Sequence, residues 1–245
     1  MQDRGVVLGA LGEKAEGLFG FGKTVTFLAM DSRGIGIIGL ADILKPNAAN
    51  VMAEIRRMGI EVAMVTGDNG RTAGAIARQA GIDRVLAEVL PEKKSEEVKK
   101  LQEEGRIVAM VGDGINDAPA LAQADVGIAI GTGTDVAMET GDITLISGDL
   151  AGIATAISLS RRTIRTIKQN LFWAFAYNVI LIPVAAGILY LAFRGGDVPS
   201  GLSFILGKYG FLNPILAAAA MALSSITVVS NSLRLRSFRP PKLAN

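Results

Sequence analysis

Apolar and polar residues alternate along the first two thirds of the chain in patterns that predict strands and helices in turn. Two β-rich runs, residues 24–30 and 35–40, are separated by Asp-Ser-Arg-Gly, which is typical of a hairpin. Beyond them, short apolar runs alternate with segments whose apolar residues recur at helical spacing. The expected strands are residues 61–65, 85–87, 107–111, 126–130 and 143–146, and the expected helices are 45–59, 71–80, 91–104, a short one from 117, and 150–169. This order predicts an α/β fold, a Rossmann-like parallel sheet whose active site lies beyond the carboxyl ends of the strands.

The last third of the chain contains two long uncharged segments. Residues 169–193 and 209–233 carry no charged side chain, and each segment is 25 residues long. A helix of that length exceeds the ~30 Å hydrocarbon core of a bilayer. The sequence therefore predicts a two-helix transmembrane hairpin, with helices at 170–193 and 211–233. Basic residues flank the pair and are sparse in the connecting loop of residues 194–210, so the positive-inside rule predicts cytoplasmic flanks and an extracytoplasmic loop.

The composition limits the available chemistry. The 245 residues include no cysteine and no histidine, which excludes disulfides, thiolate metal sites and the commonest general base. The net charge of +2 says little about partners, and no nucleic-acid partner is expected. Catalysis would have to use carboxylate, lysine, hydroxyl and amide groups.

Two loops follow expected strands, and both carry candidate site residues. In Gly-Asp-Gly-Ile-Asn-Asp (112–117), Asp113 and Asp117 concentrate negative charge that Mg²⁺ can compensate, although such a loop can also be an ordinary solvated turn. In Thr-Gly-Asp (66–68), the Thr66 hydroxyl and nearby N–H groups can hold a phosphoryl oxygen, or the loop can simply cap the next helix. Lys94 can add a fixed positive charge, with Lys93 as an adjacent competitor. Together these groups predict a phosphoryl-transfer site.

Three motifs resemble those of one family. The segments Met-Val-Thr-Gly-Asp-Asn-Gly-Arg-Thr-Ala (64–73), Pro-Glu-Lys-Lys (91–94) and Val-Gly-Asp-Gly-Ile-Asn-Asp-Ala-Pro-Ala-Leu (111–121) are similar to motifs of the haloacid-dehalogenase-like phosphorylation domain of heavy-metal P-type ATPases, specifically the copper(I)-exporting group. The resemblance extends over essentially the whole chain. It implies an ATP-driven Cu⁺ or Ag⁺ export pump that uses Mg²⁺ and an aspartyl-phosphate intermediate.

The resemblance also implies roles for individual residues. Asp113 would bind Mg²⁺, and Thr66 and Lys94 would contact the phosphoryl group. Asn116 and Asp117 would order the phosphorylated loop, and Gly67 and Asp68 complete the Thr-Gly-Asp motif. The third motif usually reads Pro-Glu-Asp-Lys, so Lys94 rather than Lys93 takes the phosphate-binding role. Residues 41–46 would form the hinge from the nucleotide-binding domain to the phosphorylation domain.

The two uncharged segments match the copper(I) signature, Asn-x6-Tyr-Asn-x4-Pro followed by Met-x2-Ser-Ser-x5-Asn. The ion path is expected to use Tyr177, Asn178, Met221 and Ser225. A thioether is a soft ligand that suits Cu⁺, and Met221 and Ser225, four residues apart, share one helix face. The zinc group instead places a lysine and an aspartate in these helices, and neither occurs here. The copper(II) group is the nearest competitor.

Several motifs of the family do not occur in this chain: the nucleophile motif Asp-Lys-Thr-Gly-Thr, Thr-Gly-Glu, His-Pro and Cys-Pro-Cys. We therefore expect a truncated pump that begins at an internal methionine and is inactive alone. The expected parts are a nucleotide-binding remnant (1–41), a phosphorylation domain lacking its nucleophile (42–150), a linking helix (151–169), two spans (170–193 and 211–233), their loop (194–210) and a cytoplasmic tail (234–245). The alternatives are a membrane-tethered phosphatase with Asp31 as nucleophile and a non-catalytic membrane subunit.

The resemblance places the protein in the plasma (inner) membrane of a prokaryote, with its catalytic module in the cytoplasm. Its partners would be the membrane and Cu⁺ ions, the latter delivered by a metallochaperone.

Overall fold

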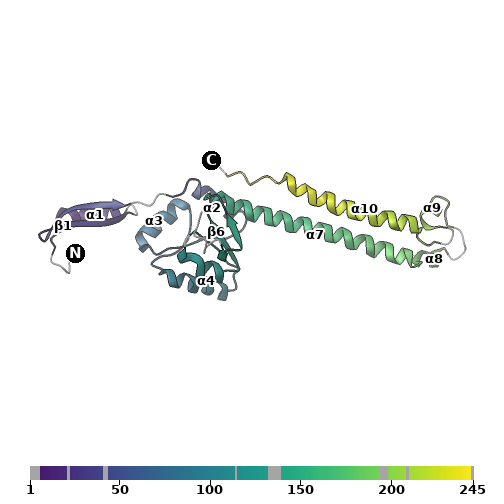
Figure 1. Ribbon diagram of the computed structural model, residues 1–245, viewed down its shortest axis with the longest axis horizontal. Coiled ribbons are helices and arrows are strands. Elements are labelled where there is room, and N and C mark those ends of the chain that lie inside the picture. The colour runs from purple at the N-terminus through teal and green to yellow at the C-terminus, as the bar shows by residue number, and fades with distance from the viewer. Residues whose placement is uncertain are drawn as a thin grey trace. The chain divides into compact units, whose positions relative to one another are not determined.

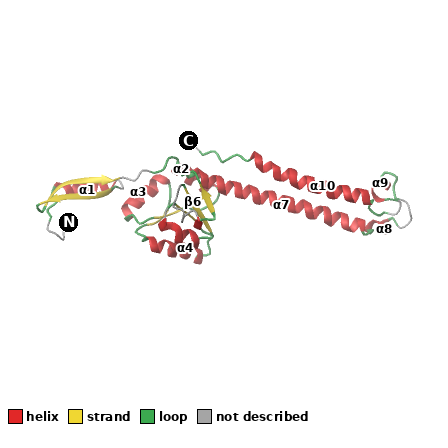
Figure 2. Cartoon of the chain, in the orientation of Figure 1, coloured by secondary structure: helices red, strands yellow, loops and turns green. Residues whose placement is uncertain are grey.

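The chain divides into two compact units, residues 1–155 with 241–245 and residues 156–240. The computed structural model describes residues 6–20, 23–40, 44–113, 115–131, 139–193, 198–207 and 210–243. Figure 1 follows the chain from its amino terminus, and Figure 2 shows its helices and strands.

The first unit begins with a helix packed on a β-hairpin. Helix α1 (Ala10–Gly20) precedes β1 (Thr24–Met30), which pairs antiparallel with β2 (Arg33–Leu40). Asp31 and Ser32 form the turn with φ of 47° and 61°, as a tight two-residue hairpin requires. The predicted hairpin is confirmed. Gly34 and Gly39 leave room for leucines on the same face: a Cβ on either would lie 3.2 Å from a leucine methyl carbon.

The remaining strands of this unit are parallel, as predicted, but they do not form one sheet. Strand β3 (Ala63–Val65) pairs with β4 (Arg84–Leu86), and β5 (Ala109–Gly112) pairs with β6 (Val126–Ile130), which pairs with β7 (Ile143–Leu145). Within the described residues, β3 and β5 each have a strand on one side only. An ion pair between Glu61, just before β3, and Arg106, just before β5, nevertheless joins the starts of the two strands.

In the described part of this unit, four helices and two 3₁₀ turns accompany these strands. Their bounds are α2 (Ala48–Arg57), α3 (Gly70–Ala80), η2 (Pro91–Lys93), α4 (Lys94–Glu103), η3 (Ile115–Asp117) and α5 (Ala118–Gln123). Helix α3 packs closely because its inner face is made of alanines, of which Ala73 and Ala77 are fully buried. It is capped by Asn69, whose side chain accepts hydrogen bonds from the N–H groups of Arg71 and Thr72. Larger buried side chains, Val51, Val98 and Leu121, complete the core.

The second unit is a helical hairpin, and its first helix differs from the prediction. Helix α7 (Ala151–Ala185) is continuous through the expected linker and first span, but it ends before residue 193. Gly187 adopts φ of 88°, and a separate helix α8 (Ile188–Ala192) follows. After α9 (Ser203–Leu206), the chain returns in α10 (Pro214–Leu233) and the 3₁₀ turn η4 (Arg234–Ser237). In the described part of the chain, only Pro214–Ser237 is long and apolar enough to cross a membrane, with mean hydropathy 1.6.

Helices α7 and α10 lie side by side (Figure 1), and contacts join the two arms of the hairpin at both ends. At the end near the basic residues, Asn231 donates to the side-chain oxygen of Asn170 at 2.8 Å, and Asn170 donates to Ser232 at 3.0 Å. At the other end, the rings of Tyr190 and Phe211 stack with centroids 5.7 Å apart. Gly187 lies so close to Phe211 that a Cβ would approach the ring to 2.5 Å.

Candidate functional site

The Thr66 loop is held firmly at the end of β3. The N–H of Thr66 donates to Leu86 and its carbonyl accepts from Val89, so the loop is tied to the segment leaving β4. The Thr66 hydroxyl donates to Asp68 at 2.8 Å and accepts from the Asp68 N–H at 3.2 Å. Because Asn69 caps α3, the alternative that the Thr-Gly-Asp loop simply caps this helix is wrong. These two polar side chains are therefore ordered by each other.

Lys94 and Asp117 form the closest ion pair of the site. The Nζ atom of Lys94, the first residue of α4, lies 2.7 Å from Oδ1 of Asp117, the last residue of η3. Their side chains are only 18% and 14% exposed, so water screens the pair weakly. Lys93 is exposed and lies in η2. The geometry thus distinguishes the two lysines that the sequence left side by side.

Asp117 also explains the glycine at the end of β5. A Cβ built on Gly112 would lie 2.6 Å from the Asp117 Cβ and 2.8 Å from one of its carboxylate oxygens. No ordinary contact between carbon atoms is that short. Glycine at position 112 therefore lets Asp117 fold back against the strand end and reach Lys94.

Asp113 is the most accessible carboxylate of the site. Its side chain is 67% exposed, and its nearest described cation is Lys45, 4.0 Å away. Asn116 is exposed as well. Gly114, between the two aspartates, lies outside the described residues, as do residues 41–43 of the expected hinge. Lys45 was not singled out from the sequence, although it stands in the expected hinge segment.

The structure arranges the predicted residues as two pairs, one at the end of β3 and one at the end of β5. Thr66–Asp68 follows β3, and Lys94–Asp117 lies beside the end of β5, with Gly67 exposed within the first loop. Among the described residues, no hydrogen bond or ion pair joins one pair to the other. That part of the chain also holds no group of three or more acidic side chains arranged to bind a metal ion.

The expected ion-path residues are Tyr177 and Asn178 on α7 and Met221 and Ser225 on α10, and among the described residues no hydrogen bond joins the first two to the last two. The Asn178 amide donates to the Ala174 carbonyl at 2.8 Å, and the Ser225 hydroxyl lies 3.4 Å from the Met221 carbonyl. Met221 is 72% exposed, and the Tyr177 ring lies near Trp173. The polar contacts that join the two helices instead involve Asn170 and Asn231.

The domain model for haloacid dehalogenase-like hydrolases matches residues 3–125, which is half of the chain. This segment contains the Thr66 loop, Lys94 and the two aspartates that follow β5.

The chain belongs to the haloacid dehalogenase-like hydrolase family.

Its relatives within this family include several metal pumps. It is 55% identical over 217 residues to the probable copper-exporting P-type ATPase V of Mycobacterium tuberculosis (strain CDC 1551 / Oshkosh), covering 89% of this chain and 25% of that protein. It is 56% identical over 236 residues to the probable copper-transporting ATPase PacS of Synechococcus elongatus (strain ATCC 33912 / PCC 7942 / FACHB-805), covering 96% of this chain and 30% of that protein. The resemblance to heavy-metal P-type ATPases is therefore confirmed.

A solved structure with the same fold comes from a related pump. A zinc-transporting PIB-type ATPase in the E2.Pi state matches with a TM-score of 0.73 and 36% identity, covering 92% of this chain and 34% of that one. This haloacid dehalogenase-like chain thus spans 25% to 34% of the length of these three proteins.

Proposed function

We propose that this chain provides the phosphorylation domain and a two-helix transmembrane hairpin of a Cu⁺-exporting P-type ATPase that works through an aspartyl-phosphate. The observation that carries the proposal is the arrangement of Thr66, Lys94 and Asp113 around the carboxyl ends of β3 and β5. Relatives named as copper pumps support the transported ion. ATP would be the substrate of the complete pump, and a metallochaperone would deliver Cu⁺.

Each loop has a distinct task in phosphoryl transfer. The Thr66 hydroxyl and nearby N–H groups would hold phosphoryl oxygens, with Asp68 fixing the hydroxyl. Lys94 would supply positive charge, and its pairing with Asp117 keeps the amine oriented while the phosphoryl group is absent. Gly67 keeps the loop small, and Asn116 would order the phosphorylated segment.

The exposed oxygen of Asp113 has the right chemistry for Mg²⁺, a hard cation that prefers carboxylate and water oxygens. Bound there, Mg²⁺ would neutralise charge on the transferring phosphoryl group. One carboxylate makes a weak site by itself. Asp113→Ala should therefore abolish a weak Mg²⁺-dependent shift of nearby amide resonances in this chain.

The unpaired edges of β3 and β5 in the described part of the chain support a location between them for the strand that carries the nucleophile. Each strand has a partner on one side only among the described residues, and Glu61 and Arg106 link their starts. A parallel strand inserted between them would end beside Thr66 and Asp113. We assign this place to the strand that carries Asp-Lys-Thr-Gly-Thr in the complete pump.

The phosphorylation proposal is tested by trapping phosphoenzyme from labelled ATP. The chain alone should form none, whereas a complete pump containing this sequence should form an acid-stable phosphoenzyme that Asp113→Ala prevents. A phosphoenzyme on the chain alone would overturn the proposal. Asp31→Asn would then decide whether Asp31 is the nucleophile of a membrane-tethered phosphatase; its place in the hairpin turn between two antiparallel strands argues against that role.

Met221 supports the choice of metal. A thioether favours Cu⁺, while the lysine and aspartate expected of a zinc pump occur in neither uncharged segment. In the complete pump, Met221→Val should nearly abolish copper-stimulated ATP turnover but leave phosphorylation by inorganic phosphate intact. Normal copper transport by the Met221→Val variant would show that Met221 is a packing residue and does not bind the transported ion. Tyr177, Asn178 and Ser225 complete the proposed path.

We propose that the protein lies in the plasma (inner) membrane of a prokaryote with its first unit in the cytoplasm. Helix α10 is apolar enough to cross the bilayer. The uncharged part of α7 runs only from Asn170 to Ala185 and includes the polar residues Asn170 and Asn178. Helix α7 would therefore cross the bilayer together with α8. Apolar side chains exposed on both helices would face lipid, among them Phe175, Val179, Ile182, Ile215 and Leu223.

A further inference from the structure

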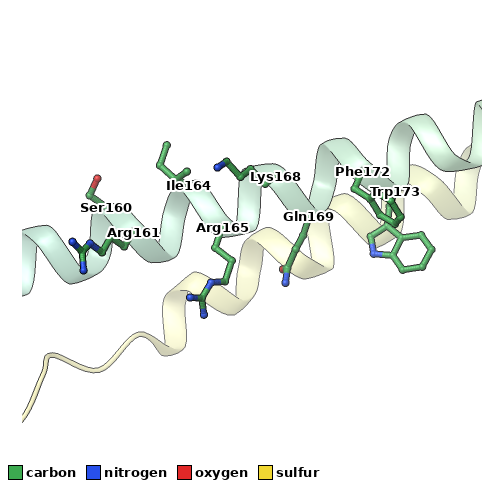
Figure 3. Close-up of a pocket in the computed structure, with 8 residues that line it drawn as sticks. All are labelled: Ser160, Arg161, Ile164, Arg165, Lys168, Gln169, Phe172 and Trp173. Carbon is green, nitrogen blue, oxygen red and sulfur yellow. The ribbon is translucent and has the colours of Figure 1, made fainter. Parts of the chain in front are cut away.

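A shallow hollow of about 590 Å³ lies along one face of α7. Its cations, Arg161, Arg165 and Lys168, occupy successive turns, and Phe172 continues the same row one turn later (Figure 3). The spacing of four, three and four residues keeps all four side chains on one helix face. Gln169 and Trp173 form the adjacent edge of the hollow.

Within the described residues, no carboxylate neutralises the charges of Arg165 and Lys168 on this face. The sequence has no aspartate or glutamate between residues 150 and 196. In the described part of the chain, Arg165 and Lys168 form no ion pair, and both side chains are exposed. A ligand for this face must therefore bring negative charge.

The same face becomes apolar within a short distance. From Arg165 to Trp173 the helix rises roughly 12 Å, and Phe172 and Trp173 lie with their rings 5.4 Å apart and nearly perpendicular. Trp173 is 47% exposed and Phe172 64% exposed, and the next turns present further exposed apolar residues. A ligand that follows this gradient has an anionic end and an apolar end.

We propose that this hollow binds the headgroup of an anionic phospholipid, with Arg165 and Lys168 on the phosphate and Phe172 and Trp173 beside the upper acyl chains. The inference rests on the proposed function in one respect, namely that α7 enters a membrane. Inorganic phosphate would satisfy the cations but leave the aromatic rings without an apolar partner. Basic residues beside a membrane surface and tryptophan at the headgroup level have the same preferences in general.

Trp173 is the only tryptophan of the chain and lines the hollow, so its fluorescence reports on the site directly. The whole chain is reconstituted into phosphatidylcholine vesicles containing phosphatidylglycerol, with bromine carried on the acyl chains of one lipid or the other. Brominated phosphatidylglycerol should quench the fluorescence of Trp173 more strongly than the mole fraction of phosphatidylglycerol in the vesicles predicts. Inorganic phosphate in the buffer should not reverse this preference.

The double variant Arg165→Gln/Lys168→Gln should lower the preference for phosphatidylglycerol roughly 25-fold at low salt, about fivefold for each cation removed. Arg162→Gln is the matched control, because Arg162 has the same charge on the same helix and does not line the hollow; its preference should stay nearly unchanged.

Three results would overturn the proposal. Equal quenching by both brominated lipids in the unaltered chain would refute the lipid preference while leaving membrane insertion intact. Absence of quenching by either lipid would refute insertion of α7 and hence the proposed function as well. Loss of the preference on adding inorganic phosphate would show that a free anion occupies the cations. The first two comparisons use the unaltered chain, so they stand even if the double variant misfolds.

Discussion

Replacing Gly112 by alanine tests whether Asp117 is held against the end of β5. The new Cβ would lie 2.6 Å from the Asp117 Cβ, about 1 Å closer than carbon atoms normally approach. Asp117 cannot move away freely, because Lys94 holds its carboxylate at 2.7 Å. Either the strand end shifts or the ion pair lengthens.

The expected magnitude follows from three contributions. Overpacking of this kind costs about 1–3 kcal/mol, and a weakened charged hydrogen bond adds about 1 kcal/mol. Alanine also reduces the conformational entropy of the unfolded chain, which offsets about 0.4–1 kcal/mol of this destabilisation. We expect a net local destabilisation of roughly 2 kcal/mol, which would lower hydrogen-exchange protection of the β5 and β6 amides about 30-fold.

The assay is amide hydrogen exchange followed by mass spectrometry on peptides from β5 and β6 of the whole chain. Gly74→Ala is the matched control: its Cβ would lie 3.7 Å from the nearest atom, in the middle of α3, and should stabilise that helix by about 0.5–1 kcal/mol. In an Asp117→Gly background, which removes the clashing Cβ, Gly112→Ala should cost almost nothing. Unchanged protection in Gly112→Ala, or the same loss in both backgrounds, would refute the close-approach argument.

Three further predictions concern the same chain. Lys94→Gln should destabilise the first unit by roughly 1–3 kcal/mol, because it leaves a mostly buried carboxylate unpaired, whereas Lys93→Gln should change stability by less than about 0.5 kcal/mol in urea denaturation. Asp125, whose pKa is lowered by the hydrogen bonds from the Val108 N–H and the Gln102 amide, should stabilise the fold at neutral pH and lose that contribution as the pH falls below about 4. Asp125→Asn should therefore flatten the acid limb of a pH titration of stability; an unchanged limb would contradict this. Asn170→Leu should loosen the hairpin, seen as faster exchange in the second half of α10, since it removes two interhelical hydrogen bonds.

The local elements were largely predictable, because each rests on residues close in sequence. The hairpin turn at Asp31 and Ser32, the start of α3 and the strand at Val126–Ile130 all follow from turn residues, caps and short apolar runs. The helix α1 was not expected, since its sequence, Ala-Leu-Gly-Glu-Lys-Ala-Glu-Gly-Leu-Phe-Gly, contains three glycines that weaken a helical pattern. Packing on the hairpin overrides that weakness.

The relation between elements was less predictable. The apolar runs at β3 and β5 indicate buried strands of a parallel sheet but do not say which strand pairs with which. Among the described residues, β3 pairs with β4 and β5 pairs with β6. The uncharged run of 25 residues predicts one continuous transmembrane helix, yet α7 ends within this run, before Gly187. Charge content alone does not reveal a glycine that packs on Phe211 with positive φ.

The site was predictable in its parts. Thr66, Lys94, Asp113 and Asp117 came from motif spacing, and their roles in phosphoryl transfer remain a prediction. The sequence could not separate Lys93 from Lys94 on physical grounds, because adjacent lysines differ only in the helix face they occupy. The ion pair with Asp117 distinguishes them.

The two ends of the α7–α10 hairpin are fastened by unlike contacts, amide hydrogen bonds at Asn170 and Asn231 and close ring and glycine packing at Gly187 and Phe211. A slide of one helix past the other by a single turn, about 5.4 Å, would break both fastenings at once. Tilting the pair together would break neither. If a path beside these helices opens and closes, the hairpin would therefore tilt as one rigid body. The contacts that change would be those between the hairpin and the neighbouring helices.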